Sequence, residues 1–326
     1  MKIITPFPDF YPQWLFHQYY RFEPKLKEWI SEKSSFFKTY NFENYLEKAL
    51  LPGRRTRPLI LLEIQNRISE RSKEGIIASI SIELLHRAAI ILDDFLDADS
   101  IRRGKQTFHT EFGLEASVLF PHLITSFAYE EYLKLNPSSD QLTNWLISIQ
   151  EIVLAEYSDL VQQSQMTLEQ QFDLSIKRTQ LFFQLINNYL WILTGKNDKS
   201  LSVALGTFGK YFQISNDVFD TFYFSEDSRY NEKSEKRFTL SFPSIKLIRQ
   251  NKINKNDVFK TMSFESFKYL QEMAWEYWGN EKSILEPEKD NALYEIYHLN
   301  MPTNIKELFI ELINLCSKKD YWLHTY

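Results

Sequence analysis

The sequence predicts an all-α fold, and three observations carry that prediction. The chain has only 8 glycines in 326 residues, too few for the many tight turns of a meandering sheet. It has 26 Phe, 18 Tyr and 7 Trp, bulky side chains that suit packed helices. Its longer segments, such as 145–163 and 178–195, space their apolar residues as helices do. We therefore expect a bundle of about ten helices forming a single domain over residues 1–326.

The breaks between these segments support a single domain. They are short and polar, at 136–141, 194–200, 226–237 and 301–304. None is long enough for an interdomain linker, and no fixed-period repeat is present. The expected helices therefore share one core.

Composition excludes several classes of protein. The formal charge of −5, with scattered Lys and Arg, provides no basic stripe, so we expect no nucleic-acid partner. The single cysteine, Cys316, permits no internal disulfide and favours a cytoplasmic location. Residues 1–16 lack an apolar core of signal-peptide length, and no run of about 18 uncharged apolar residues is present. We expect no transmembrane segment.

The first segment with chemical character is "PGRRTRP" at 52–58, which supplies Arg54, Arg55 and Arg57. Guanidinium groups match phosphate oxygens in a bidentate manner. Alone, the segment is typical of a solvated helix start. Beside acidic clusters it indicates a phosphate site.

The next such segment, 84–104, reads "LLHRAAIILDDFLDADSIRRG". On a helix, Asp93 and Asp97 lie on one face, and His86 lies two turns earlier on the same stripe. Carboxylates held together repel one another unless a cation lies between them, and hard oxygen ligands at this spacing suit Mg²⁺. The alternative interpretation is a solvated helix end with ordinary exposed acids.

A second acidic cluster follows at 212–220, "FQISNDVFD", with Asn216, Asp217 and Asp220. Asn216 and Asp220 lie four residues apart, on one helical face. Two such patches on separate helices can face each other across a bundle and hold several metal ions between them. With the nearby arginines, this pattern predicts a site that binds a diphosphate.

Three strings together resemble one family. "ELLHRAAIILDDFLDADSIRRGKQTFH" resembles the first aspartate-rich region of the trans-isoprenyl diphosphate synthases, a class I terpenoid synthase fold. "PGRRTRP" is similar to that family's GGKRxRP, and "FGKYFQISNDVFD" to its second aspartate-rich region. The resemblance covers roughly residues 40 to 250. It implies an all-α fold with a central active-site cavity, a cluster of three Mg²⁺ ions, prenyl diphosphate substrates and a homodimer.

The resemblance also implies roles for individual residues. Asp93 and Asp97 match Mg²⁺ ligands on one wall, with Asp94 in support. The second wall matches Asn216, Asp217 and Asp220. The family's positions that bind isopentenyl diphosphate correspond to Arg54, Arg57, His86 and Arg103. The position that contacts the allylic diphosphate corresponds to Arg102, and further substrate-binding positions correspond to Arg178 and Gln213.

The implied reaction is a Mg²⁺-dependent condensation of an allylic diphosphate with isopentenyl diphosphate. The main catalytic contribution would be electrostatic stabilisation of the departing diphosphate. No protein nucleophile is required, which agrees with the lack of a Ser-His-Asp or Cys-His pattern.

Departures from the family pattern keep other functions open. Arg54 and Arg178 replace the usual lysines, and Asn216 replaces the first aspartate of the second region. Class I terpene synthases also begin their second motif with Asn-Asp, so a cyclase acting on a C15 or longer diphosphate is one alternative. A prenyltransferase to a peptide or small molecule and a non-catalytic partner subunit are the others.

Product length depends on the residues one turn before Asp93, which are Ala88 and Ala89. Side chains on a helix tilt toward its N-terminus, so these two would line the cavity below the bound diphosphate. Bulky side chains at these positions stop chain growth in the family, and two alanines leave the space open. We expect a product of C15 or longer. Alternatively, the small residues only let two helices pack closely.

Overall fold

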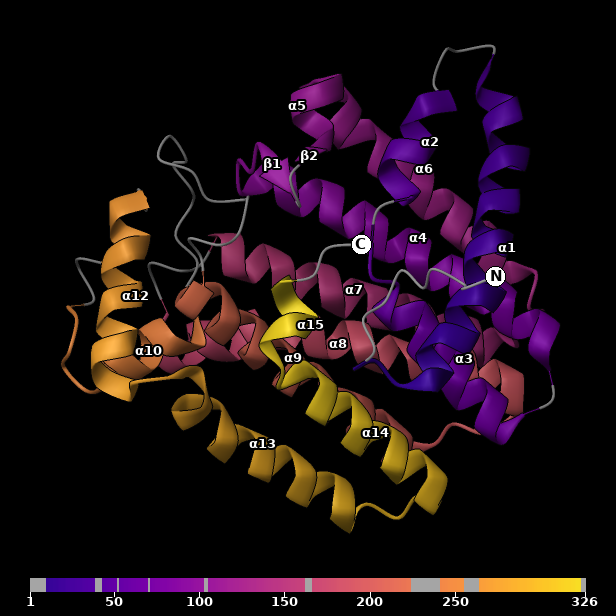
Figure 1. The fold of residues 1–326 in the computed structure, drawn as a ribbon. Coiled ribbons are helices and arrows are strands. Elements are labelled where there is room, and N and C mark those ends of the chain that lie inside the picture. Colours follow the sequence, from indigo (N-terminus) through magenta and orange to yellow (C-terminus); the bar gives the residue numbers. More distant parts are fainter. Residues whose placement is uncertain are drawn as a thin grey trace, which may run out of the picture.

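The computed structural model describes residues 10–38, 43–51, 53–69, 71–102, 105–161, 166–223, 241–254 and 264–323. Within these residues it contains fourteen helices and one small hairpin (Figure 1). The helices are α1 (Gln13–Phe37), α2 (Glu43–Leu50), α3 (Thr56–Ile68), α4 (Ser72–Leu96), α5 (Phe108–Phe112), α6 (Leu114–Leu133), α7 (Ser139–Val161), α8 (Leu168–Thr194), α9 (Lys199–Tyr223), α10 (Phe242–Arg249), α12 (Phe264–Trp278), α13 (Glu281–His298), α14 (Thr303–Cys316) and α15 (Lys319–Leu323).

The all-α prediction is confirmed. Ten of the described helices have 13 residues or more. The predicted breaks at 136–141, 194–200 and 301–304 overlap the connections from α6 to α7, from α8 to α9 and from α13 to α14. The predicted break at 226–237 lies outside the described residues.

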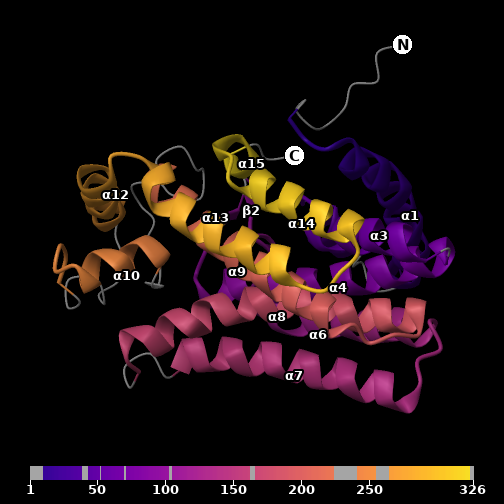
Figure 2. The same cartoon turned by 90° about the horizontal axis from the view of Figure 1, so that it is seen from below.

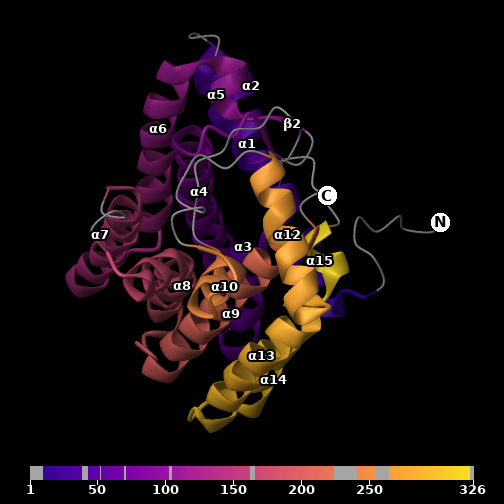
Figure 3. The same cartoon turned by 90° about the vertical axis from the view of Figure 1, so that its left-hand side faces the viewer.

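Three long helices, α4, α8 and α9, form the centre of the molecule. Helix α4 packs against α3, α6 and α8, and α8 packs in turn against α7 and α9. Helices α13 and α14 lie side by side on the far face of α9, and α7 lies at the opposite edge (Figures 2 and 3). The two segments with acidic clusters are thus on α4 and α9, which both contact α8.

One apolar cluster unites helices from both ends of the chain. It includes Tyr11 before α1, Phe183 on α8, Phe208 on α9 and Trp322 on α15. A smaller cluster joins α10 to α12 through Ile248 and other residues. Burial of aromatic and aliphatic side chains on this scale is the main stabilising contribution to a helical bundle.

Helix α4 is the one described helix that is long and apolar enough to cross a membrane, over Lys73–Leu96. Of its most apolar window, 67% is buried inside the fold. Its hydropathy is therefore explained by its position between α3, α6 and α8.

Local signals set the ends of α8 and the C-terminal end of α4. Thr167 and Gln170 form a capping box at the start of α8, and Gly195 ends that helix in the left-handed region with φ of 74°. Helix α4 ends at Leu96, and Ala98 turns the chain with φ of 57°. The chain then forms the antiparallel hairpin of β1 (Ile101–Arg102) and β2 (Lys105–Gln106), which the all-α prediction did not include.

Candidate active site

The first acidic segment lies at the C-terminal end of α4. The Asp97 backbone N–H donates to the Asp93 carbonyl at 2.9 Å, so Asp97 continues the helical spacing and lies near Asp93. Burial raises the pKa of Asp94 to about 6, although Arg102 opposes the shift. Burial, followed by the charge of Asp93, raises the pKa of Asp97 to about 7. The positive charge around these two carboxylates is too small to offset the effect of burial on their pKa.

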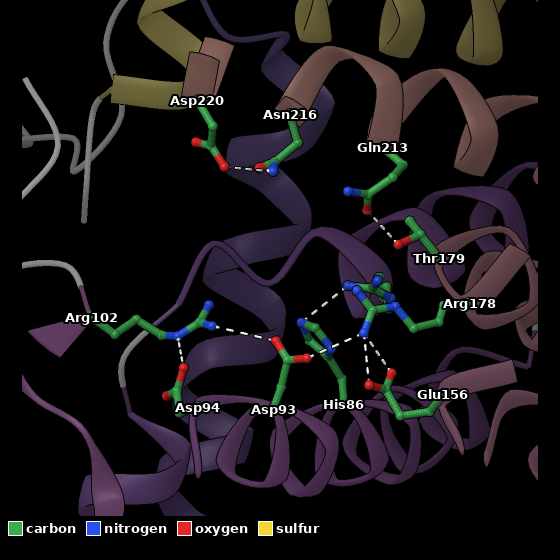
Figure 4. A network of polar contacts seen from close by, with 11 residues as sticks. His86, Asp93, Asp94, Arg102, Glu156, Arg178, Thr179, Gln213, Asn216 and Asp220 are labelled. Carbon is green, nitrogen blue, oxygen red and sulfur yellow. Dashed lines mark hydrogen bonds and ion pairs between the residues drawn. The ribbon is translucent and has the colours of Figure 1, made fainter. Parts of the chain in front are cut away.

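The hairpin after α4 returns an arginine to this cluster. The Arg102 Nε donates to Asp94, and its Nη2 lies 3.6 Å from the Asp93 Oδ2 (Figure 4). Arg102 thus contacts both carboxylates from β1. Its neighbour Arg103 lies outside the described residues.

The second acidic segment lies in the last three turns of α9. The Asn216 Nδ2 donates to the Asp220 Oδ2 at 2.9 Å, as expected for residues four apart on one face. Figure 4 shows these two side chains pointing from α9 toward the side on which Asp93 and Arg102 lie. The predicted arrangement of two facing acidic segments agrees with this view.

Asp217 is held by hydrogen bonds at both oxygens. Its Oδ1 accepts from Gln213 Nε2 at 2.7 Å and its Oδ2 from the Phe242 backbone N–H at 2.9 Å. Gln213 in turn accepts from the Thr179 hydroxyl at 2.6 Å, which links α8, α9 and α10. Burial nevertheless raises the pKa of Asp217 to about 7, and each oxygen retains a second lone pair for a cation.

Arg178 on α8 bridges two carboxylates. Its Nη1 lies 2.7 and 2.8 Å from the two oxygens of Glu156 on α7, and 3.4 Å from the Asp93 Oδ1. Glu156 was not predicted as a site residue. The signal that could have identified it is an acid in the middle of the otherwise apolar stretch "IVLAEY" of the expected helix 145–163.

The basic segment at the start of α3 places Arg57 against His86. The Arg57 Nη1 lies 3.0 Å from the His86 Nε2, and because arginine can only donate, the imidazole accepts at Nε2. Arg57 also lies over the rings of Phe182 and Phe183, at 5.0 and 4.7 Å from their centroids. Burial lowers the pKa of Arg57 to about 10, so it remains charged at neutral pH. The structure thus joins two predicted substrate-binding residues 29 positions apart.

Arg54 points instead toward the C-terminal helix. It donates to the Trp322 carbonyl and lies over the Tyr321 and Trp322 rings, at 5.0 and 5.2 Å from their centroids. Trp322 also contacts the ring of Phe212 on α9. Helix α15 therefore covers part of the predicted phosphate site.

Arg55 has a structural role. It adopts φ of 56°, and its buried side chain donates to Glu23 at 2.9 Å and to Glu83 at 2.6 Å. Arg87 donates to the same Glu83 oxygen at 2.7 Å. Gly53 permits this arrangement, because an added Cβ would lie 1.6 Å from the Arg87 Nη2. The four buried charges hold the segment that carries Arg54 and Arg57 against α1 and α4.

The two alanines proposed to set product length differ in burial. Ala88 is buried in the core, 3% exposed, whereas Ala89 is half-buried at its edge. Both belong to α4, two and three residues after His86. Ala89 is therefore the better position at which to test the length prediction.

The donor atoms of the two acidic segments suit Mg²⁺. They are carboxylate and amide oxygens, and burial raises the pKa of Asp97 and of Asp217, an effect that a nearby cation would oppose. Among the described residues, no three His, Cys, Asp or Glu side chains meet closely enough to hold an ion by themselves. Oxygens of a bound diphosphate would have to complete the coordination shell.

The family model of polyprenyl synthetase matches residues 40–275. The chain belongs to the polyprenyl synthetase family. The resemblance deduced from the three sequence motifs is thereby confirmed, and the match extends beyond the last of them.

Relatives and solved structures agree with this family. The chain is 26% identical over 178 residues to geranylgeranyl pyrophosphate synthase of Geoglobus acetivorans, covering 52% of this chain and 56% of that protein. It is 27% identical over 177 residues to geranylgeranyl diphosphate synthase of Sulfolobus acidocaldarius, covering 51% and 54%. The chain thus spans about half the length of the curated relatives it matches.

A solved structure of polyprenyl synthase from Caulobacter crescentus, complexed with calcium and isoprenyl diphosphate, superimposes with a TM-score of 0.74. The alignment has 17% identity and covers 94% of this chain and 97% of that one. Geranylgeranyl pyrophosphate synthetase from Pyrococcus horikoshii gives 0.70, at 18% identity over 94% and 98%. These likenesses show that the polyprenyl synthetase fold extends over nearly the whole chain.

Proposed function

We propose that the chain is a Mg²⁺-dependent prenyltransferase that condenses an allylic diphosphate with isopentenyl diphosphate to give a product of C15 or longer. The observation that carries this proposal is the pair of buried Arg57 and half-buried His86, which uses none of the acidic residues of α4 and α9. An enzyme that only ionises and cyclises one allylic diphosphate needs no second diphosphate site. The names of the curated relatives support the same activity.

The residues divide into two groups by the substrate they would bind. Arg54, Arg57 and His86 would hold the diphosphate of isopentenyl diphosphate, and the aromatic rings beside Arg57 keep water from it. Arg102 and Arg178 would hold the allylic diphosphate beside Asp93. Gln213 would fix the orientation of Asp217 through its hydrogen bond.

Mg²⁺, three ions by our proposal, would be held by Asp93, Asp97, Asn216, Asp217 and Asp220 and would supply charge neutralisation at the departing diphosphate. The allylic C–O bond breaks with its electron pair on the diphosphate. The double bond of the second substrate forms the new C–C bond, and a proton leaves the adjacent carbon to restore a double bond. Arg102 and Arg178 stabilise the charge that develops on the leaving group, and Asp94 holds Arg102 in place.

A product assay tests this function. The protein is incubated with Mg²⁺ and dimethylallyl, geranyl, farnesyl or geranylgeranyl diphosphate, each with and without isopentenyl diphosphate. We expect a longer prenyl diphosphate only when both substrates are present, and at least a 100-fold loss of turnover in Asp93→Ala and in Asp217→Ala, because each removes charge stabilisation. Turnover within a few-fold of wild type in both variants would contradict the two-segment metal site.

The same assay separates the alternatives. The Asn-Asp start of the second motif favours a terpene cyclase, which would release a hydrocarbon from one allylic diphosphate and would tolerate Arg57→Ala. A lack of Mg²⁺-dependent turnover with every substrate would favour a non-catalytic partner subunit or transfer to a peptide or small molecule.

We further propose a homodimer that buries the outer surface of α6 and α7. Large apolar side chains are exposed there, among them Leu119 at 67%, Val153 at 60% and Leu154 at 61%. Helix α7 lies at one edge of the molecule, opposite α14 (Figure 2). Exposed apolar surface of this kind is typical of an interface between subunits. A cytoplasmic location and a single domain over residues 1–326 remain predictions.

A further inference from the structure

Arg178 lies between Asp93, a proposed Mg²⁺ ligand, and Glu156, an acid with no proposed role. The Glu156 carboxylate accepts from Arg178 Nη1 at 2.7 and 2.8 Å, whereas Asp93 Oδ1 lies 3.4 Å from the same nitrogen. Figure 4 shows Arg178 between the two, with Glu156 approaching from α7 and Asp93 from α4. The shorter distances assign most of the attraction to Glu156.

The position of the Arg178 guanidinium between Glu156 and Asp93 affects whether Asp93 can bind a metal. A guanidinium and a divalent cation compete for the same oxygen lone pairs of a carboxylate. Arg102 lies 3.6 Å from the other Asp93 oxygen, so both oxygens of Asp93 have an arginine nearby. If Arg178 were to move fully onto Asp93, a metal ion would have to displace it.

We propose that Glu156 is a positioning residue that holds Arg178 away from Asp93 and so keeps an oxygen of Asp93 available to a divalent cation. The proposal rests on the proposed Mg²⁺-dependent function. Glu156 gives the Arg178 charge a carboxylate partner on α7, within reach of the proposed allylic diphosphate. The Arg178 and Glu156 side chains are 23% and 29% exposed, so water only partly screens their attraction.

Without the Glu156 charge, Asp93 becomes the preferred partner of Arg178. Glu156→Gln keeps the shape of the side chain and removes the charge. We expect the apparent affinity for Mn²⁺, a probe of the Mg²⁺ site, to fall by roughly two- to fivefold in this variant, the effect of one partly exposed ion pair.

The experiment is a titration of the full chain with Mn²⁺ alone, followed by the electron paramagnetic resonance signal of the free ion. Wild type, Glu156→Gln, Arg178→Gln and the double variant are compared at one pH and ionic strength. Glu151→Gln is the matched control, because Glu151 is an exposed acid on the same helix. Melting temperatures verify that each variant is folded.

The double variant distinguishes positioning from a simple change of charge. If Glu156 acts through Arg178, Glu156→Gln weakens Mn²⁺ binding in the wild-type background but not in the Arg178→Gln background. Equal weakening in both backgrounds would mean that Glu156 acts on the metal directly, and would overturn the proposal. Unchanged affinity in Glu156→Gln would overturn it as well.

The failure of this inference can be told apart from the failure of the function. Asp93→Asn should abolish the Mn²⁺ binding that Glu156 affects. If wild type bound no Mn²⁺, or if Asp93→Asn left binding unchanged, the assignment of Asp93 as a ligand would be wrong and the inference would fall with it. Mg²⁺-dependent product formation with no coupling between Glu156 and Arg178 would uphold the function and reject the inference.

Discussion

Replacing Glu83 by glutamine tests the buried charges beneath the basic segment. Burial alone would raise the pKa of Glu83, but Arg87 and Arg55 hold it below its ordinary value. With Glu23, these side chains form two buried pairs of zero net charge. Glu83→Gln leaves one positive charge uncompensated where the Arg55 and Glu83 side chains are fully buried.

The expected cost is about 3–5 kcal/mol of unfolding free energy, the usual consequence of breaking a buried ion pair from one side. For a chain of 326 residues the unfolding entropy is roughly 0.7 kcal/mol/K near 60 °C, so the melting temperature should fall by about 4–7 °C. Thermal unfolding followed by circular dichroism measures the change.

Two further variants show whether charge is the cause. Lys25 and Glu28 form a pair on α1 whose side chains are 54% and 60% exposed, and Glu28→Gln should lower the melting temperature by less than about 1 °C. Adding Arg87→Met to Glu83→Gln restores neutrality and should recover part of the loss. A Glu83→Gln variant that melts within 1 °C of wild type, or a double variant that melts lower than the single one, would refute the reasoning.

Three other predictions follow from the site and the surface. Burial raises the pKa of Asp217 to about 7, so the metal-free folded protein retains a proton that the unfolded chain loses near pH 4. Its stability, measured as the melting temperature, should therefore fall as the pH rises from about 4 to about 7. In Asp217→Asn this part of the decrease should be missing. The same dependence of melting temperature on pH in both proteins would contradict the raised pKa of Asp217. Ala89→Phe should shorten the prenyl product while diphosphate release continues, as product chromatography would show, and an unchanged product distribution would exclude Ala89 as a length determinant. Leu154→Asp should convert a dimer to a monomer in sedimentation velocity, whereas Val203→Asp, at an exposed apolar position on α9, should not; a monomeric wild type would reject the dimer.

The sequence was sufficient to predict the helical fold and the two segments with acidic residues. Apolar spacing identifies buried helical faces, and the i, i+4 spacing of Asn216 and Asp220 alone places them together. The hairpin that returns Arg102 to Asp94 was not predicted, because two-residue strands leave no periodic signal.

Side-chain partners across helices were harder to predict. Arg54, Arg55 and Arg57 are alike in sequence, but only Arg55 adopts a positive φ and turns inward to Glu23 and Glu83. Glu156 meets Arg178 because α7 packs on α8, and no spacing within either helix indicates which residues face each other. The helix-packing geometry determines these pairs.

The support of the basic segment extends beyond the part of the chain that resembles the family. Glu23, on α1, precedes the matched residues 40–275, and Trp322, on α15, follows them. A fragment cut at those limits would leave Arg55 buried beside Glu83 without its second carboxylate and would expose the side of Arg54 that α15 covers. The shortest piece of this protein that can fold with Arg54 and Arg57 held as they are here is therefore longer than the region that sequence similarity outlines, and mutations in α1 or α15 can displace these arginines from outside that region.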